Sequence, residues 1–266
     1  MNPPLPPQAP SHHEIRPGLV IEGDEVVRTL LPERTLRHFR DDESAVYGPK
    51  LIEHLGASDL SDKDMLRALL DATAEVHAQV EEITGIPVLP ATLEETDDSW
   101  RLRAPRLVEP EDVTLDQRFS FLPGVTEYYE YVVDNAIALV NGEADEPIVY
   151  HNDLTRVNQY MFGSVDGEVP HLILTDLDTE IDTAGEQDEY GWMIDKHVPW
   201  GLIDLATGAH YYSDGEAIME KVEELAERLR VEGMISDEEL GRIQQGYELG
   251  YQNPDWEDEF LPASAT

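Results

Sequence analysis

Carboxylate and amide side chains in the middle of this sequence have the types and spacing that phosphoryl transfer requires. Asp153 and Asn158 lie in the stretch 151–158, and Asp176 follows a later apolar run. In this chemistry one Asp accepts or orients the proton of the attacking hydroxyl, while an Asn and a second Asp hold the Mg²⁺ that neutralises triphosphate oxygens. The order predicts Asp153 as the catalytic residue. The candidate metal ligands are Asn158, Asp176 and Asp178, the last either a ligand or a solvent-exposed carboxylate.

The segments around these residues have patterns that would position them. Apolar residues recur at helical spacing over 125–140, and the strand-like segment 147–150 leads into the loop. A short apolar run, a Gly/Asp turn at 163–167 and the strand-like segment 171–175 then lead to Asp176. Helix, strand, loop, hairpin and carboxylate therefore follow one another in the chain.

With these motifs the chain resembles the aminoglycoside phosphotransferase and choline kinase branch of the protein-kinase-like superfamily. Asn152 before the catalytic Asp and Leu177 after the metal Asp favour this small-molecule branch over the protein kinases. The Asp-Leu-Ala element within 201–206 and the pair Gly246-Tyr247 resemble further elements of the branch. The resemblance covers roughly residues 125 to 250. It implies ATP and Mg²⁺ as cofactors and a small-molecule hydroxyl acceptor.

The fold class that follows is α+β, a bilobal protein-kinase-like fold with a small N-terminal antiparallel-sheet lobe and a larger, mainly helical C-terminal lobe. We expect a disordered Pro-rich arm over 1–12, an N-lobe over 13–110, a C-lobe over 111–252 and an acidic tail over 253–266. The connector between the lobes is placed near 108–112, where charge and proline are typical of an exposed segment.

The N-lobe is expected to begin with a small antiparallel sheet over 14–31, with 26–30 as its clearest strand. A helical segment over 32–56, interrupted at Gly48-Pro49, and an amphipathic helix over 65–83 should follow. Two more strands are predicted over 88–94 and 100–108.

The nucleotide phosphates need a basic group in this lobe. Kinases of this superfamily use a strand Lys paired with a helix Glu, but the lysines here are Lys50, Lys63, Lys196 and Lys221, and none lies in a predicted strand. Arg28 takes the corresponding position and is either a phosphate contact or a solvated strand charge. Its helix partner is either Glu43 or Glu75.

Other polar residues are predicted to support the fold. His151 should brace the loop through hydrogen bonds, and Asp204 should accept backbone N–H bonds near it. Five histidines that precede the motif do not have the spacing of a metal site and are expected to lie singly on the surface: His12, His13, His38, His54 and His77. The segment 196–200 lies where a substrate could meet the C-lobe.

Capping boxes are predicted for two C-terminal helices, at Ser213 with Glu216 and at Ser236 with Glu239.

The composition is strongly acidic, with 57 Asp and Glu against 18 Lys and Arg and a formal net charge of −39. This pattern favours a halophilic protein, because molar salt screens the repulsion between carboxylates. The alternatives are an acidic interaction protein or a nucleic-acid mimic. Direct binding to nucleic acid is disfavoured because the chain has no basic patch.

No apolar run approaches a membrane span, no signal peptide is visible, and cysteine is absent. A cytoplasmic protein is expected, whereas the oligomeric state stays open.

Three functions remain open from the sequence. The first is an ATP- and Mg²⁺-dependent phosphotransferase that acts on a hydroxyl of a small molecule. The second is a pseudokinase or nucleotide-binding interaction protein that has lost catalysis together with the strand Lys. The third is an acidic structural or viral protein in which the motif is accidental. The orientation of Arg28 separates the first two, and the distance between Asp153 and Asp176 tests the third.

Overall fold

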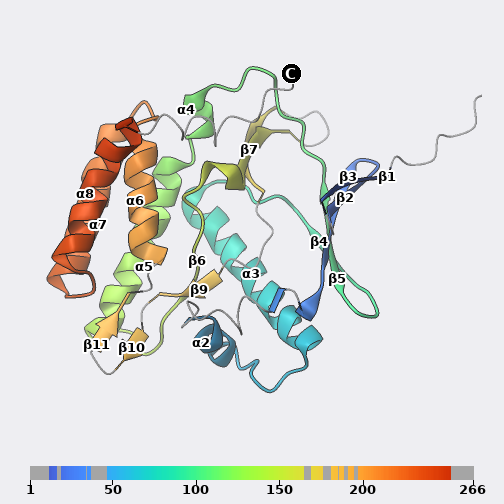
Figure 1. Cartoon of the computed structure of the whole chain (residues 1–266), viewed down its shortest axis with the longest axis horizontal. Helices are drawn as coiled ribbons and strands as arrows, with labels where there is room; N and C mark the ends of the chain where they lie inside the picture. The colour runs from blue at the N-terminus through green and yellow to red at the C-terminus, as the bar shows by residue number, and fades with distance from the viewer. Residues whose placement is uncertain are drawn as a thin grey trace, which may run out of the picture.

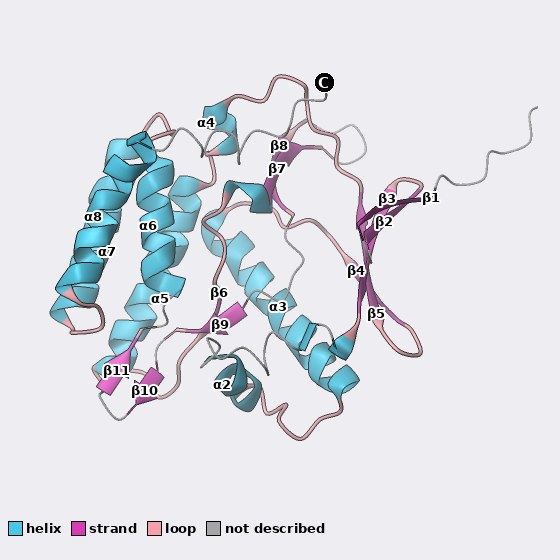
Figure 2. Cartoon of the chain, in the orientation of Figure 1, coloured by secondary structure: helices cyan, strands magenta, loops and turns pink. Residues whose placement is uncertain are grey.

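The structure is a computed structural model that describes residues 12–16, 19–33, 35–36, 47–164, 169–175, 181–184, 186–188, 191–194 and 197–252. The Pro-rich segment 1–11 and the acidic segment 253–266 lie outside the described residues. So do three of the predicted site residues: Glu43, Asp176 and Asp178. The described chain mixes helices with strands and carries a small antiparallel sheet near its N-terminus (Figures 1 and 2).

The N-terminal sheet has the strand order β1-β2-β3-β5-β4, with antiparallel neighbours throughout. Gly23 adopts a left-handed φ of 69° in the turn between β2 and β3, where the Gly-Asp pair predicted a turn. The predicted small sheet is therefore confirmed, although its last two strands are shorter than expected. Its strands are β1 (His12–Arg16), β2 (Leu19–Glu22), β3 (Glu25–Leu30), β4 (Thr92–Glu95) and β5 (Trp100–Pro105).

The long helix α3 (Asp62–Thr84) lies between β3 and β4 in the chain and shares a hydrophobic core with Leu30, Trp100 and Leu102 of the sheet (Figure 1). The Ser61 hydroxyl caps its N-terminus by accepting the Asp64 N–H, and Gly85 ends it with a left-handed φ of 68°. The indole of Trp100 donates to the Lys63 carbonyl at 3.2 Å. The helix predicted over 65–83 is confirmed, with one extra turn at its start.

Helix α2 (Tyr47–His54) precedes α3 and corrects the expected interruption at Gly48-Pro49. Both residues lie in the first helical turn, where proline is tolerated because the N–H groups there have no intrahelical acceptor. Leu51 is fully buried on this helix.

Short strands in the middle of the chain form the predicted loop and hairpin. Strand β6 (Val149–His151) pairs with β9 (Ile181–Thr183), and β7 (Tyr160–Gly163) pairs with β8 (His171–Leu174). A single 3-10 turn, η1 (Val157–Gln159), leads into β7. The chain also forms the short hairpin of β10 (Glu186–Asp188) and β11 (Gly191–Met193).

Two isolated bridges connect the hairpin to the segments that flank the N-terminal sheet. Val88 pairs with Leu174 of β8, and Val108 pairs with Ser164 just after β7. The second bridge has two backbone hydrogen bonds of 3.2 Å, one in each direction. The predicted connector at 108–112 therefore begins at a point where the chain is fixed to the hairpin.

The C-terminal part of the described chain is mainly helical. Helix α5 packs against α3, α6 and α7, and α6 packs closely on α8 (Figure 1). Gly201 permits the contact of α6 with α5, because an added Cβ would lie 2.1 Å from the Tyr129 hydroxyl. Gly246 likewise permits the contact of α8 with α6, since a Cβ added at this position would lie 3.0 Å from the Ile203 carbonyl oxygen. The helices are α4 (Leu115–Arg118), α5 (Leu122–Val140), α6 (His197–Ala209), α7 (Gly215–Val231) and α8 (Asp237–Gln252).

One of the two predicted capping boxes forms. The Ser236 hydroxyl accepts the Glu239 N–H at 3.2 Å, and the Glu239 carboxylate accepts the Ser236 N–H at 2.7 Å. The box predicted at Ser213 is wrong, because α7 starts later and Asp214 is its N-cap residue. The Ser213 N–H instead donates to Asp116 Oδ1 at 3.0 Å.

Candidate functional site

The loop around Asp153 is fixed from the inside by a buried histidine. His151 ends β6 and is fully buried, and its backbone N–H donates to the Tyr128 hydroxyl on α5. Its Nδ1 accepts the backbone N–H of Asp153 at 3.2 Å. The prediction that His151 braces the loop through hydrogen bonds is confirmed.

Both carboxylate oxygens of Asp153 have partners from its own loop. Arg156 Nε lies 3.0 Å from Oδ1, and Gln159 Nε2 donates to Oδ2 at 2.6 Å. The Asp153 side chain is 16% exposed and the Arg156 side chain 60%. The carboxylate is therefore held in a defined orientation in a partly buried position, which is what a catalytic base requires.

Gln159 also connects Asp153 to the end of strand β8. Its carbonyl oxygen accepts the Thr175 N–H at 2.7 Å and the Thr175 hydroxyl at 2.9 Å. Thr175 directly precedes Asp176 in the chain. Gln159 thus contacts Asp153, the predicted catalytic base, through its side chain. Through its backbone it contacts Thr175, which precedes the predicted metal ligand in the chain. The H-x-D-x-x-x-x-N pattern does not include Gln159, so the motif alone does not identify this residue.

Asp204 supports the loop from helix α6, by a route different from the predicted one. Its Oδ2 accepts the Thr155 hydroxyl at 3.1 Å, where backbone N–H donors were expected. The pKa of Asp204 is raised above its ordinary value, mainly because the carboxyl is buried and also because of the Asp153 charge. The Thr155 hydrogen bond and the Arg156 charge act in the opposite direction. Asp153, Arg156 and Asp204 therefore form one electrostatic cluster.

His77 corrects the expectation of a surface histidine. It is 9% exposed on α3 and stacks on His151, with ring centroids 5.5 Å apart and an interplanar angle of 25°. Burial lowers the pKa of His77 to about 4, and burial together with the His77 charge lowers that of His151 well below 6.5. The Nε2 atoms of both rings have no hydrogen-bond partner among the described residues. Both rings are therefore neutral at pH 7.

Arg28 lies on the face of the sheet that packs toward α3. Its cross-strand partner is Leu102, and the neighbouring pair on that face is Leu30 with Trp100. These three apolar residues belong to the core that includes α3. Residues directly opposite each other on antiparallel strands share a face, so Arg28 points inward, where it is partly buried. The Arg101 and Arg103 side chains lie on the opposite face.

The remaining predicted site residues divide into exposed and undescribed ones. Asn158 is exposed on η1, and Glu75 is exposed on α3. Within the described ranges no group of three or more His, Cys, Asp or Glu side chains could hold a metal ion. The predicted ligands Asp176 and Asp178 lie outside those ranges. The donors in this region are carboxylate and amide oxygens, and these suit Mg²⁺.

A small apolar cluster lies between the sheet and the hairpin. It joins Ala104 of β5 to Ile173 of β8 and to Leu89, with Leu107 packed against it. Ala104 shares its sheet face with Arg28, because it pairs with Val26 two residues away on β3. Apolar side chains therefore extend from Arg28 toward β8, the strand that ends beside Gln159.

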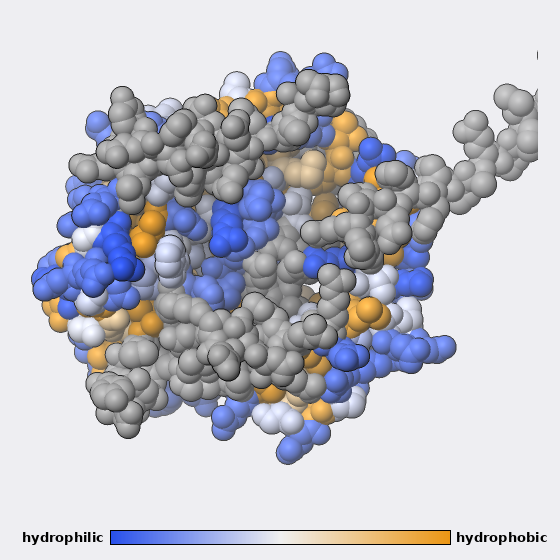
Figure 3. Space-filling view, viewed as in Figure 1, coloured by the Kyte–Doolittle hydropathy of each residue, from blue (hydrophilic) through white to orange (hydrophobic). Residues whose placement is uncertain are grey.

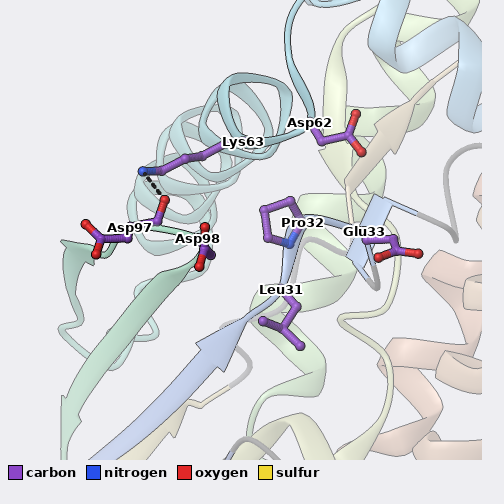
Figure 4. A pocket seen from close by; sticks show the side chains of 7 residues that line it. All are labelled: Leu31, Pro32, Glu33, Asp62, Lys63, Asp97 and Asp98. Atoms are coloured by element: carbon purple, nitrogen blue, oxygen red, sulfur yellow. Dashed lines mark hydrogen bonds between the residues drawn. The ribbon is translucent and has the colours of Figure 1, made fainter.

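A cavity of about 600 Å³ lies elsewhere, at the start of α3 (Figure 4). Lys63 points toward the β4–β5 turn there, and its Nζ lies 2.7 Å from Glu95 Oε1. This cavity contains none of the predicted site residues. Its lining is Leu31, Pro32, Glu33, Asp62, Lys63, Asp97 and Asp98.

The segment predicted to meet a substrate is partly described. Lys196 lies outside the described residues, and His197 begins α6 with its Nδ1 3.6 Å from Asp182 Oδ2 on β9. Trp200 is 59% exposed. An aromatic surface is thus available on α6, the helix that also carries Asp204.

Comparisons with known proteins give no match to a family model, a curated protein or a solved structure. In the described part of the chain, none of the helices has the length and apolar character of a membrane span. Hydrophilic residues cover much of the described surface on the face shown in Figure 3. Functional inference for this chain therefore depends on the geometry around Asp153.

Proposed function

We propose that this protein is an ATP- and Mg²⁺-dependent phosphotransferase that transfers the γ-phosphoryl group to a hydroxyl of a small molecule. The observation that carries the proposal is the double contact of Gln159. Its side chain donates to Asp153 at 2.6 Å, and its carbonyl oxygen accepts two hydrogen bonds from Thr175, next to Asp176. Gln159 thus contacts both Asp153 and the residue that precedes Asp176 in the chain.

The order of the elements supports a bilobal protein-kinase-like fold. Helix α5, strand β6, the Asp153 loop and the β7–β8 hairpin follow one another as the resemblance implies. An antiparallel sheet with one long helix precedes them. ATP would lie between the two parts, against the apolar cluster of Ala104 and Ile173, with Arg28 near the phosphates.

Asp153 would orient the acceptor hydroxyl and take up its proton. Its carboxylate is held by Gln159 and its backbone by His151, so the loop that carries it has a defined orientation. Asn158 and Asp176, with Asp178 as a further ligand, would hold Mg²⁺. When bound, the ion neutralises charge on the triphosphate oxygens.

The acceptor is proposed to be a small molecule on the strength of the Asn152 and Leu177 variants in the motifs. The exposed ring of Trp200 on α6 gives such an acceptor a surface on which to pack. The acidic composition does not select its charge, because the carboxylates are spread over the whole chain.

One observation favours a nucleotide-binding protein without catalysis. None of the described strands contains a lysine, and the basic residue at the predicted phosphate position is Arg28. The broad guanidinium fits a tight phosphate site less well than a compact ammonium does. A pseudokinase would bind the nucleotide and transfer nothing.

Calorimetric titration with ATP at molar KCl, with and without Mg²⁺, tests the proposal, followed by a screen of hydroxyl acceptors. The phosphotransferase should bind ATP more tightly with Mg²⁺ and form ADP only in the presence of an acceptor. Binding without turnover across a broad acceptor panel would favour the pseudokinase. Absence of nucleotide binding would remove both functions.

A further inference from the structure

Arg156 is the cation nearest to the reactive carboxylate in the described structure. Its Nε lies 3.0 Å from Asp153 Oδ1, and its charge also lowers the pKa of Asp204. Arg156 is not one of the specified residues of the H-x-D-x-x-x-x-N motif. A solvent-exposed arginine is thus paired with the loop carboxylate and interacts electrostatically with a second carboxylate, on helix α6.

The two partners of Asp153 differ in how easily they can leave. Gln159 is partly buried, and its carbonyl oxygen holds Thr175 through two hydrogen bonds. Arg156 is 60% exposed, and an exposed ion pair contributes only about 0–1 kcal/mol. Arg156 is therefore the partner that an incoming group can displace from Asp153.

Displacement of Arg156 opens one side of Asp153 to an acceptor hydroxyl, because each carboxylate oxygen already accepts one donor from the loop and Gln159 stays in place on Oδ2. A charged phosphoryl group is a better partner for the guanidinium than one carboxylate oxygen, since it accepts two parallel N–H bonds from the planar fork. A phosphoryl group close to Asp153 would thus draw Arg156 away and free Oδ1.

We infer that Arg156 binds the phosphoryl group during transfer and thereby releases Asp153 for the acceptor. The inference rests on the proposed function. The bond between the γ-phosphorus and the β–γ bridging oxygen breaks, and ADP leaves with the electron pair. The acceptor oxygen bonds to the γ-phosphorus, and its proton passes to Asp153 Oδ1 and then to solvent.

The test uses Mg-ADP with aluminium fluoride, a planar mimic of the phosphoryl group in transfer. Calorimetry at molar KCl measures the affinity for Mg-ADP with and without aluminium fluoride, called fluoride below. The proteins compared are wild type, Arg156→Gln and Arg156→Lys. Arg242→Gln is the matched control, because Arg242 is 58% exposed in an ion pair with Glu238 on α8. It removes the same charge far along the chain from the loop.

Fluoride should tighten Mg-ADP binding to wild type, and Arg156→Gln should lose about tenfold to a hundredfold of that gain, the range for one charge-assisted hydrogen bond. Arg156→Lys should lose less, and Arg242→Gln should match wild type. Mg-ADP affinity without fluoride and the thermal unfolding temperature should not change in Arg156→Gln. If Arg156 only neutralised Asp153, Arg156→Gln would show the same gain in Mg-ADP affinity with fluoride as wild type.

Three results would overturn the inference while the proposed function stands. They are an unchanged fluoride gain in Arg156→Gln, an equal loss in Arg242→Gln, and no fluoride gain in a wild type that binds Mg-ADP and turns over. If wild type binds no Mg-ADP at all, the proposed function fails and the inference fails with it.

Discussion

The imidazole of His77 on helix α3 stacks on that of His151 at the start of the Asp153 loop, with 5.5 Å between ring centroids. Since His151 Nδ1 accepts the Asp153 N–H, its proton must lie on Nε2. Both rings are buried and neutral. Helix α3 therefore contacts the start of the candidate catalytic loop through a pair of rings that cannot readily accept a proton.

Stability should fall on mild acidification because of this pair. The folded-state pKa of His77 is about 4 against an ordinary 6.5, so the unfolded chain takes up a proton first as the pH falls. The contribution of His77 is complete above pH 6.5 and is lost progressively toward pH 4, up to about 3 kcal/mol. Denaturant unfolding at molar KCl across this pH range measures the loss.

His77→Phe tests this pH dependence, because it keeps an aromatic ring against His151 and removes the titratable imidazole. His54→Phe removes a histidine that is exposed at the end of α2. The first variant should flatten the acid limb of the stability curve and the second should leave it unchanged. Equal curves for wild type and His77→Phe would contradict the prediction.

The two predicted capping boxes should differ in their effect on stability. Ser236→Ala removes a hydroxyl that accepts the Glu239 N–H and should lower the free energy of unfolding by about 1 kcal/mol. Ser213→Ala should change it by less than about 0.5 kcal/mol, because α7 has Asp214 at its N-cap. Thermal unfolding of both variants measures the difference, and an equal loss would contradict the described caps.

This contrast shows how far sequence patterns reach. The S-x-x-E spacing is the same at both sites, but α7 begins at Gly215, which lies against the Ala209 carbonyl where no side chain would fit. Local spacing predicts which residues can cap a helix, while packing decides where the helix begins. The amphipathic pattern of α3 was predictable because one buried face controls it over its whole length.

Low salt should unfold the protein if its charge of −39 is a halophilic adaptation. The Debye length rises from about 3 Å in 1 M salt to about 10 Å in 0.1 M salt, so repulsion between carboxylates returns. Circular dichroism along a KCl dilution series measures the transition. Full helicity at about 0.1 M KCl would instead favour an acidic interaction protein.

Arg28 and Arg101 provide a matched test of the nucleotide site, because they lie on opposite faces of the same sheet. Arg28 pairs with Leu102 on the inner face, whereas Arg101 pairs with Thr29 on the outer face. Arg28→Gln should weaken ATP binding about tenfold or more, the effect of one charged hydrogen bond. Arg101→Gln should leave the affinity unchanged in calorimetry at molar KCl. Equal effects would make Arg28 an ordinary surface charge.

The candidate site shows the same limit of prediction at shorter range. The sequence pattern selected Asp153 and Asn158, and the structure orients Asp153 through Gln159, next to Asn158 in the chain. A 3-10 turn over 157–159 decides which of these two amides points at the carboxylate, and no residue spacing specifies it. Burial of His77 likewise depends on the approach of α3 to β6, a contact between segments distant in sequence.

Asp153→Asn separates the chemical step from binding. It keeps the shape of the side chain but removes the proton acceptor, so kcat should fall by about 10²–10⁴-fold while Mg-ATP affinity stays near that of wild type. Asp145→Asn, at an exposed position after α5, removes the same charge and should have no effect. Asp176→Ala should instead lower the Mg²⁺-dependent part of the affinity. If wild type turns over and Asp153→Asn keeps its full kcat, Asp153 is not the base, and the geometry around Gln159 has a purely structural role.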